Sequence, residues 1–358
     1  MRKYILLLIS FTFALLSTAS AQSTSATEEK TEKINIQNII FGHTDDAYEW
    51  HIANIGENHI IIPLPVILWS EASGWNVFLS SQFEKNNGTY NGFYISQSGK
   101  YKGKIVERDA SNNEVRPIDI SITKNVLELF IVSALMLFIF LSCARWYKKK
   151  QPHDDAPKGF VGFIEMFIMS INDDVIKSSI GEKHYKFYAP YLLTAFFFIF
   201  ISNLIGLVPI FPGGANLTGN IAITFFLAVC TFIAVNLFGN KHYWKDIFWP
   251  EVPTWLKFPV PMMPVVEFFG VFTKPFALMI RLFANILAGH AIVISLVCII
   301  FITVQMGAFI GTSMTIVSVI MTIFMDFLEL LVAFIQAYVF TMLSAVFIGL
   351  AHLEPKSE

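Results

Sequence analysis

Five charged residues stand within a long apolar stretch near the end of the chain. Between Pro259 and His352 the only formal charges are Glu267, Lys274, Arg281, Asp326 and Glu329. A charge inside a bilayer costs at least about 2.5–3.5 kcal/mol even on the most lenient scale, and such groups mark ion paths or pair with one another. These five residues are therefore the first candidates for a functional site.

The first three charges are spaced so that they share one side of a helix. Glu267, Lys274 and Arg281 are seven residues apart, so successive positions drift by only about 20° around the axis. Asn285 follows Arg281 by one turn and stays on the same side. The spacing predicts a single polar stripe, which a kink at Pro275 makes approximate.

Arg281 has the most distinctive position, because it lies well inside the apolar run. A guanidinium stays protonated in proteins and cannot carry a proton. It can act as a fixed positive charge that attracts a passing carboxylate and blocks direct proton crossing. The structural alternative is an ion pair with Asp326 or Glu329 that holds two helices together. For Lys274, a structural pair with Glu267 is the favoured interpretation.

His290 and Glu329 could together relay protons. A histidine titrates near neutral pH, and burial can tune a carboxyl group toward the same range. His290 lies nine residues after Arg281, about half a turn around the helix, so it is expected to face a separate aqueous path. Glu329 shares a face with Gln336, and Asp326 lies about 60° away from it. A buried hydrogen-bonded pair is the alternative.

The composition indicates a polytopic membrane protein. Of 358 residues, 54% are hydrophobic and 15% charged, against roughly a quarter charged in soluble domains, and the mean hydropathy is +0.57. A net charge of -2 suggests no nucleic-acid partner. Cys143, Cys230 and Cys298 lie in apolar runs without metal-ligand spacing, which predicts buried apolar side chains.

The N-terminus has the layout of a secretory signal peptide, residues 1–21. Arg2 and Lys3 precede a short apolar stretch, and Ala19-Ser20-Ala21 offers the cleavage pattern. The stretch is shorter than the about 20 residues that span a bilayer, although an uncleaved anchor is the alternative. In either case we expect the following segment to be exported.

Residues 22–122 form the next predicted part, a solvated linker followed by a β-rich exported domain. Strand-like runs occur at Asn58–Ile62 and Trp75–Leu79. His51 and His59 have no partners at ligand spacing and are interpreted as ordinary histidines. Turn-forming dipeptides separate the runs: Asn87-Gly88, Asn91-Gly92 and Ser98-Gly99.

Residues 123–358 are predicted to form the membrane domain. The first span is 126–144, and the cations that follow it place that end in the cytoplasm: Arg145, Lys148, Lys149 and Lys150. Residues 160–178 predict an amphipathic helix at the cytoplasmic interface, with a soluble loop helix as the alternative. Further spans are predicted at 188–211 and 218–238, and Lys241, His242 and Lys245 mark a return to the cytoplasm.

The last two helices are predicted at 263–304 and 313–352, and form a hairpin. Both exceed a simple span, and tilting can absorb the excess length. Gly307 and Gly311 mark the expected turn. The C-terminal tail is then expected to be cytoplasmic.

Three motifs resemble one known family. Pro275–His290 contains an Arg-Leu-Phe-x-Asn-x-x-x-Gly core, Ile335–Phe340 reads Ile-Gln-Ala-Tyr-Val-Phe, and Asn203–Pro209 reads Asn-Leu-Ile-Gly-Leu-Val-Pro. Together they resemble subunit a of the F-type ATP synthase, and the resemblance covers residues 159–352. The predicted signal peptide and β-rich domain go beyond the compact family pattern and resemble extended bacterial versions.

The resemblance implies a role for each matching residue. Arg281 matches the arginine that faces the carboxylates of the rotor ring, with Asn285 and Gln336 near it. His290 and Glu329 match channel positions where the family keeps a histidine and an acid, in either order. The remaining candidates are an acid of the cytoplasmic path and three supporting residues: Glu267, Lys274, Asp326 and Asn203.

The fold class implied is an all-α polytopic membrane protein with about five membrane helices and a small β-rich extramembrane domain. The function implied is a stator subunit with two proton half-channels in the bacterial inner membrane, partnered by the c-subunit ring, the subunit b stalk and lipid. No cofactor or metal is expected, and without a phosphate-binding loop motif the ATP chemistry is assigned to partner subunits.

Three other classes of membrane protein predict features that this sequence does not match. A secondary transporter would show inverted repeats, and a metalloenzyme would show His-Glu-x-x-His. A passive anchor would need no arginine deep in an apolar helix.

Overall fold

The computed structural model describes residues 46–55, 58–86, 88–97, 99–109, 113–149, 156–208, 213–249, 262–304 and 307–352. All of them belong to one compact unit, Ile36–Glu358. The predicted signal peptide, the linker, the prolines before Met262 and the C-terminal tail lie outside the described residues, as do the side chains of His51 and His59.

The described chain starts with short antiparallel strands. A hairpin of β1 (Glu49–Ile55) and β2 (Asn58–Pro63) stands alone, and a three-stranded sheet has the order β4 (Gly74–Leu79), β3 (Pro65–Ser70), β9 (Ile118–Asp119). A four-stranded sheet follows the order β5 (Thr89–Tyr90), β6 (Phe93–Ile95), β7 (Ile105–Arg108), β8 (Glu114–Val115). One short helix, α3 (Ser81–Lys85), lies between β4 and β5 in the chain.

A small apolar core holds this β-rich region together. Its buried side chains are Tyr48, Val66, Leu68, Phe83, Phe93 and Ile105. The Tyr48 hydroxyl donates to the Asp119 carboxylate, and burial raises the pKa of Tyr48 above its usual value, so the phenol remains a donor. Asn91 and Gly92 both have positive φ and connect β5 to β6 as a two-residue turn, as their types predict.

The rest of the described chain is helical. Its elements are α4 (Lys124–Lys149), α5 (Phe160–Ser170), the π-helix η2 (Ile171–Lys177), α6 (Ser178–Ile180), α7 (Tyr185–Gly206), α8 (Ile221–Leu237), α9 (Lys241–Phe248), α10 (Met262–Val304) and α11 (Ala308–Ala351). Four helices are long and apolar enough to cross a membrane, or up to five when α8 and α9, bent by 98°, count as one. The predicted fold class is therefore confirmed.

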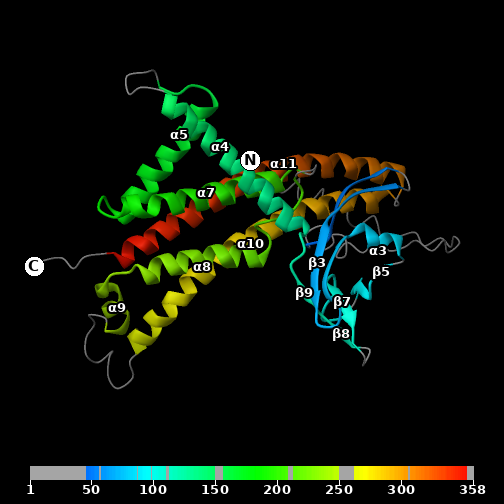
Figure 1. Ribbon diagram of the computed structural model, residues 1–358. Coiled ribbons are helices and arrows are strands. Elements are labelled where there is room, and N and C mark those ends of the chain that lie inside the picture. The colour runs from blue at the N-terminus through cyan, green and yellow to red at the C-terminus, as the bar shows by residue number, and fades with distance from the viewer. Residues whose placement is uncertain are drawn as a thin grey trace, which may run out of the picture. The chain divides into compact units, whose positions relative to one another are not determined.

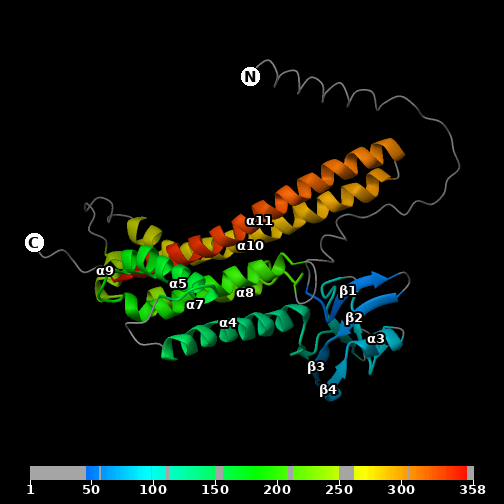
Figure 2. The same cartoon turned by 90° about the horizontal axis from the view of Figure 1, so that it is seen from above.

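The last two helices form the long hairpin that the sequence predicts. In Figures 1 and 2, α10 and α11 run antiparallel and side by side over most of their length. The helix α11 begins at Ala308 rather than at residue 313, so only Gly307 of the two predicted turn glycines precedes it. Gly311 lies inside α11, where an added Cβ would stand 3.1 Å from the Cα of Val304. This glycine therefore permits close approach of the two helices rather than forming the turn.

Other helix limits also differ from those predicted, for local reasons. The helix α7 ends at Gly206 rather than 211, and 209–212 lie outside the described residues. The helix α8 starts at Ile221 because Asn220 is its N-cap and accepts a hydrogen bond from the Ala222 amide at 2.9 Å. The predicted interfacial helix runs on through η2 and α6 until Gly181, whose φ is 87°.

The side of α11 that packs in the helical core is built from small residues. They recur at helical spacing and are fully or almost fully buried: Ala333, Ala337, Thr341, Ser344 and Ala345. Small side chains let helix backbones approach closely in membrane proteins, and α7 is among the helices that pack against α11. At the Ala351 end, His352 Nε2 lies 3.0 Å from the Tyr188 hydroxyl, and the Asn240 amide donates to the Ala351 carbonyl at 2.9 Å.

Gly349 offers a test of this close packing. A Cβ at Gly349 would lie 2.1 Å from the Ser179 carbonyl oxygen, whereas a Cβ at Gly270 would meet nothing within 4 Å. Gly349→Ala is therefore expected to destabilise the purified chain by about 1–3 kcal/mol, because backbone must move. Gly270→Ala, the matched control, should be neutral or stabilising by about 0.5–1 kcal/mol. Equal thermal denaturation midpoints for the two variants in detergent would contradict the close contact.

Candidate functional site

The helix α10 presents Arg281 on an exposed face whose neighbours are small. Arg281 and Asn285 are both exposed, as predicted for one side of a helix. The surrounding positions on that side are Ala277, Ala284 and Ala288, and they are exposed too. An arginine among alanines leaves room for another helix to lie directly against the guanidinium.

Arg281 forms no ion pair within the part of the chain that the structure describes. The structural alternative, a bond between Arg281 and a carboxylate of α11, is therefore not found there. Glu329 instead contacts His290, and Asp326 is exposed. A lasting positive charge with no counter-ion among the described residues is poised to attract an anionic group from another chain.

His290 and Glu329 meet, as predicted for facing helices. His290 Nδ1 and Glu329 Oε1 lie 2.9 Å apart, with side chains that are 18% and 6% exposed. The contact is close but poorly aligned, and Glu329 Oε1 has no hydrogen-bond partner among the described residues. Two glycines flank the pair: Cβ atoms added at Gly289 and Gly206 would lie 3.0 Å from Glu329 Oε1 and 3.8 Å from His290 Nε2. The pair therefore occupies space that larger residues would fill.

Buried polar groups of α7 and of the segment before α8 form a network. The Asn203 side-chain amide donates to the Ala333 carbonyl of α11 at 3.3 Å, and the Thr218 hydroxyl donates to Asn203 Oδ1 at 2.5 Å. Asn216 Oδ1 accepts from the Gly219 amide at 2.9 Å. Asn203 was expected as a supporting residue, and the network fixes its amide orientation.

Several buried polar atoms in the described residues have no hydrogen-bond partner. They include Ser202 Oγ, Asn216 Nδ2 and Glu329 Oε1. Because buried polar groups are almost always satisfied by protein or water, three such atoms on converging elements favour a hydrated interior. Water beside a titratable His–Glu pair can carry protons.

Glu128 is a buried acid that the sequence analysis missed. It lies on α4, is 0% exposed, and neither of its carboxyl oxygens has a hydrogen-bond partner among the described residues. The signal was present, since a lone acid inside the predicted span 126–144 is costly unless it has a role. Ser202, Asn216 and Thr218 were missed because single uncharged polar residues carry no such signal.

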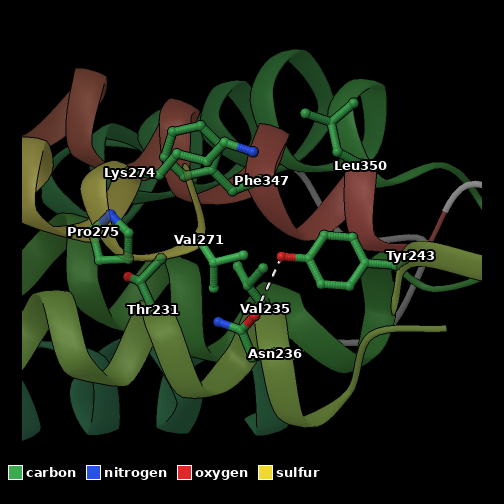
Figure 3. Close-up of a pocket in the computed structure, with 9 residues that line it drawn as sticks. All are labelled: Thr231, Val235, Asn236, Tyr243, Val271, Lys274, Pro275, Phe347 and Leu350. Atoms are coloured by element: carbon green, nitrogen blue, oxygen red, sulfur yellow. Dashed lines mark hydrogen bonds between the residues drawn. The ribbon is translucent and has the colours of Figure 1, made fainter. Parts of the chain in front are cut away.

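A small cavity lies among α8, α9, α10 and α11. Figure 3 shows the residues that line it, and its volume of about 20 Å³ is enough for one water. The Tyr243 hydroxyl points to Asn236 and donates to its Oδ1 at 3.2 Å. Lys274 extends along Phe347, with Nζ 5.8 Å from the ring centroid. The favoured pair of Lys274 with Glu267 is not formed among the described residues, and Glu267 is half-buried.

Gln336 does not join Arg281 in the described structure. It is buried on the same side of α11 as Glu329, whereas Arg281 and Asn285 are exposed on α10. No hydrogen bond links Gln336 to either of them among the described residues. The geometry thus forms two groups, the exposed Arg281 face and the buried His290–Glu329 pair.

Comparison with known proteins assigns most of the chain to a family. The family described as ATP synthase A chain matches residues 126–349. The chain belongs to that family. The resemblance in the three sequence motifs is therefore confirmed, and the family is that of a non-catalytic subunit of the membrane sector. Residues 39–126 match a separate family described as a domain of unknown function (DUF8433).

Individual relatives carry the same description. ATP synthase subunit a of Chlorobium phaeobacteroides is 45% identical over 239 residues, covering 65% of this chain and 66% of the relative. ATP synthase subunit a 2 of Chlorobaculum tepidum is 45% identical over 243 residues, covering 66% and 65%. ATP synthase subunit a of Chloroherpeton thalassium is 42% identical over 243 residues, covering 66% and 68%. The chain thus spans about two thirds of the length of these relatives.

The buried network can be tested at Thr218. Thr218→Val removes the donor to Asn203 Oδ1 and should cost about 1–3 kcal/mol of stability, because a buried acceptor loses its partner. Thr224 is equally buried but its hydroxyl bonds only to carbonyls of its own helix end, Asn220 and Ile221. Thr224→Val is therefore the matched control and should cost less. Thermal unfolding in detergent compares the two, and an equal loss would argue against the cross-element bond.

Proposed function

We propose that this chain is the stator subunit a of a rotary F-type ATP synthase, and that it couples proton flow to rotation through two half-channels. Family membership supports the general role. The observation that carries the detailed role is Arg281, an exposed cation on an alanine-lined helix face with no ionic partner in the described residues. In this proposal the rotor carboxylates pass that face.

Arg281 would act on the rotor by charge alone. A deprotonated rotor carboxylate is attracted to the guanidinium, whereas a neutral carboxyl group is free to move into lipid at much lower cost. Because the guanidinium stays charged, it also prevents protons from crossing between the two half-channels. Asn285, one turn away on the same exposed face, would supply an uncharged polar neighbour.

The outer half-channel in this proposal uses the His290–Glu329 pair. Their contact at 2.9 Å, and the unsatisfied polar atoms of Ser202 and Asn216, support a hydrated route to the rotor. Asn203 would hold α7 against α11 through its bond to the Ala333 carbonyl. Protons entering here neutralise a rotor carboxylate.

The inner half-channel would use Glu267 and the small cavity beside Lys274. The hydroxyl of Tyr243 and the amide of Asn236 give that cavity a polar wall that suits water. After nearly a full turn the rotor carboxyl group releases its proton to this side. Each charge that crosses supplies about 2.3 kcal/mol per 100 mV of membrane potential.

The proposal includes the partners and the topology of the chain. The partners are the c-subunit ring, the subunit b stalk, the rest of the complex and membrane lipid. Residues 1–21 are a signal peptide, 22–122 an exported domain and 123–358 the membrane domain, with the C-terminus in the cytoplasm of a bacterium. The cations in the last turns of α4 and in α9 support this orientation. ATP chemistry belongs to partner subunits.

Replacement of Arg281 tests the central role. In membrane vesicles that carry the assembled complex, Arg281→Ala should abolish ATP-driven proton pumping and raise passive proton leak, because the barrier between the half-channels is lost. Arg145→Ala, an exposed arginine at the end of α4, is the control and should pump normally. Co-purification of the other subunits verifies assembly. Pumping near the unsubstituted rate by assembled Arg281→Ala complexes would refute the half-channel scheme.

The two acids of α11 provide a second test. Glu329→Gln removes the carboxylic acid beside His290 and should lower proton pumping by at least about tenfold. Asp326→Asn alters an exposed acid one turn away and should have a much smaller effect. The measurement is initial pumping rate in vesicles with equal amounts of complex. If the two variants are equally impaired, burial beside His290 is not what makes Glu329 functional.

A further inference from the structure

One face of the β4-β3-β9 sheet is apolar and uncovered. Antiparallel register sets Trp69 beside both Trp75 and Ile118. The same face continues two residues along each strand, because side chains alternate between faces. Its members, here named the outer sheet face, are Pro65, Ile67, Trp69, Trp75, Val77, Leu79, Ile118 and Ile120.

The outer sheet face is strongly exposed along β4 and β9, whereas its three β3 members are half-buried. Trp75 is 64% exposed, Val77 69% and Ile118 56%. The opposite side of the sheet is the core side, where Val66 and Leu68 are completely buried. Scattered exposed apolar side chains are ordinary, but a contiguous patch that includes two tryptophans marks a surface that binds something.

This face is attached directly to the first membrane helix. The Ile120 amide donates to the Ile67 carbonyl at 3.0 Å and the Ile122 amide donates to the Pro65 carbonyl at 3.1 Å. The helix α4 begins at Lys124, whose amide donates to the Ala47 carbonyl at 2.9 Å. Only about 14 Å of extended chain can separate Ile120 from that helix. The sheet is therefore bound to the start of a membrane span rather than held on a long tether.

The chemistry of the face fits lipid better than a soluble protein. None of its eight members carries a charge, and tryptophan is enriched where an apolar surface meets lipid headgroups. At the Trp69 end the face adjoins a groove of about 520 Å³ whose walls carry charges of both signs: Glu71, Glu107, Arg108, Asp109 and Arg116. A zwitterionic headgroup layer also presents charges of both signs. The charged groove therefore suits the headgroup layer, and the apolar face suits the acyl chains beneath it.

We propose that the outer sheet face lies on the phospholipid surface of the bilayer that α4 enters. The β-rich region then contacts the membrane surface beside the start of the first span. Its occupant is lipid, and a protein partner is the competing outcome that the experiment separates. This inference goes beyond the proton path and does not depend on it.

A spin label on the full chain in phospholipid nanodiscs tests the proposal. With Cys143, Cys230 and Cys298 replaced by alanine, Val77→Cys carries a nitroxide on the outer sheet face. Glu84→Cys labels an exposed position on α3 and is the matched control. Collisions with oxygen, which concentrates in lipid, and with a water-soluble nickel chelate are measured. We expect the oxygen-to-nickel ratio at position 77 to exceed that at position 84 several-fold.

Two outcomes would overturn the proposal. Equal nickel access at positions 77 and 84 would mean that water covers the face. Protection of position 77 only in the assembled complex, and not in nanodiscs holding this chain alone, would assign the face to a protein partner. A measurement without cysteine changes guards against misfolding: brominated lipid should quench the tryptophan fluorescence of the unsubstituted chain more than that of Trp75→Phe, and equal quenching would also overturn it.

Discussion

The constraint on which the rest of the structure depends is the cost of keeping a permanent cation against an apolar surface. Arg281 cannot lose its proton, and no acid in the described residues neutralises it. Small residues surround Arg281 on its face of α10, so the guanidinium stays at the surface. It is thereby kept apart from the buried His290–Glu329 pair. The half turn between Arg281 and His290 converts a sequence spacing into this separation. The helix α10 therefore has two different environments. Arg281 is charged and exposed, whereas His290 is largely buried beside Glu329.

The coarse architecture and the central residues could be predicted from sequence. Long apolar runs predict α4, α7, α10 and α11, because backbone in a bilayer must bond to itself and hydropathy then reveals the spans. Arg281 and Glu329 can be detected in the sequence because a charged residue in an apolar run is energetically costly and is usually functional. The meeting of His290 with Glu329 was also predicted, since both belong to helices that a short turn makes neighbours.

Other features depend on packing that no local pattern contains. The helix α7 ends at Gly206 although apolar residues continue, and the Gly206 position lies against the Ala215 carbonyl. Ser202, Asn216 and Thr218 converge only because the segment before α8 folds back beside α7. In β4 the sequence predicts a strand but not which face is buried: Trp75, Val77 and Leu79 turn outward, whereas Phe78 packs against the core. The two-residue period of a strand determines that side chains alternate between its faces. Which of the two faces is buried depends on the tertiary neighbours.

The contact at Gly349 has a mechanical consequence. A side chain between two helices can bend when one of them is pushed, but here the α11 backbone meets the Ser179 carbonyl without an intervening side chain. The bonds from Asn240 to Ala351 and from Tyr188 to His352 attach the same end of α11 to α7 and to the segment before α9. In the stator role proposed above, sideways force on the hairpin would reach these neighbours with little elastic loss. The Ala351 end of α11 would then serve as the rigid mount of the hairpin.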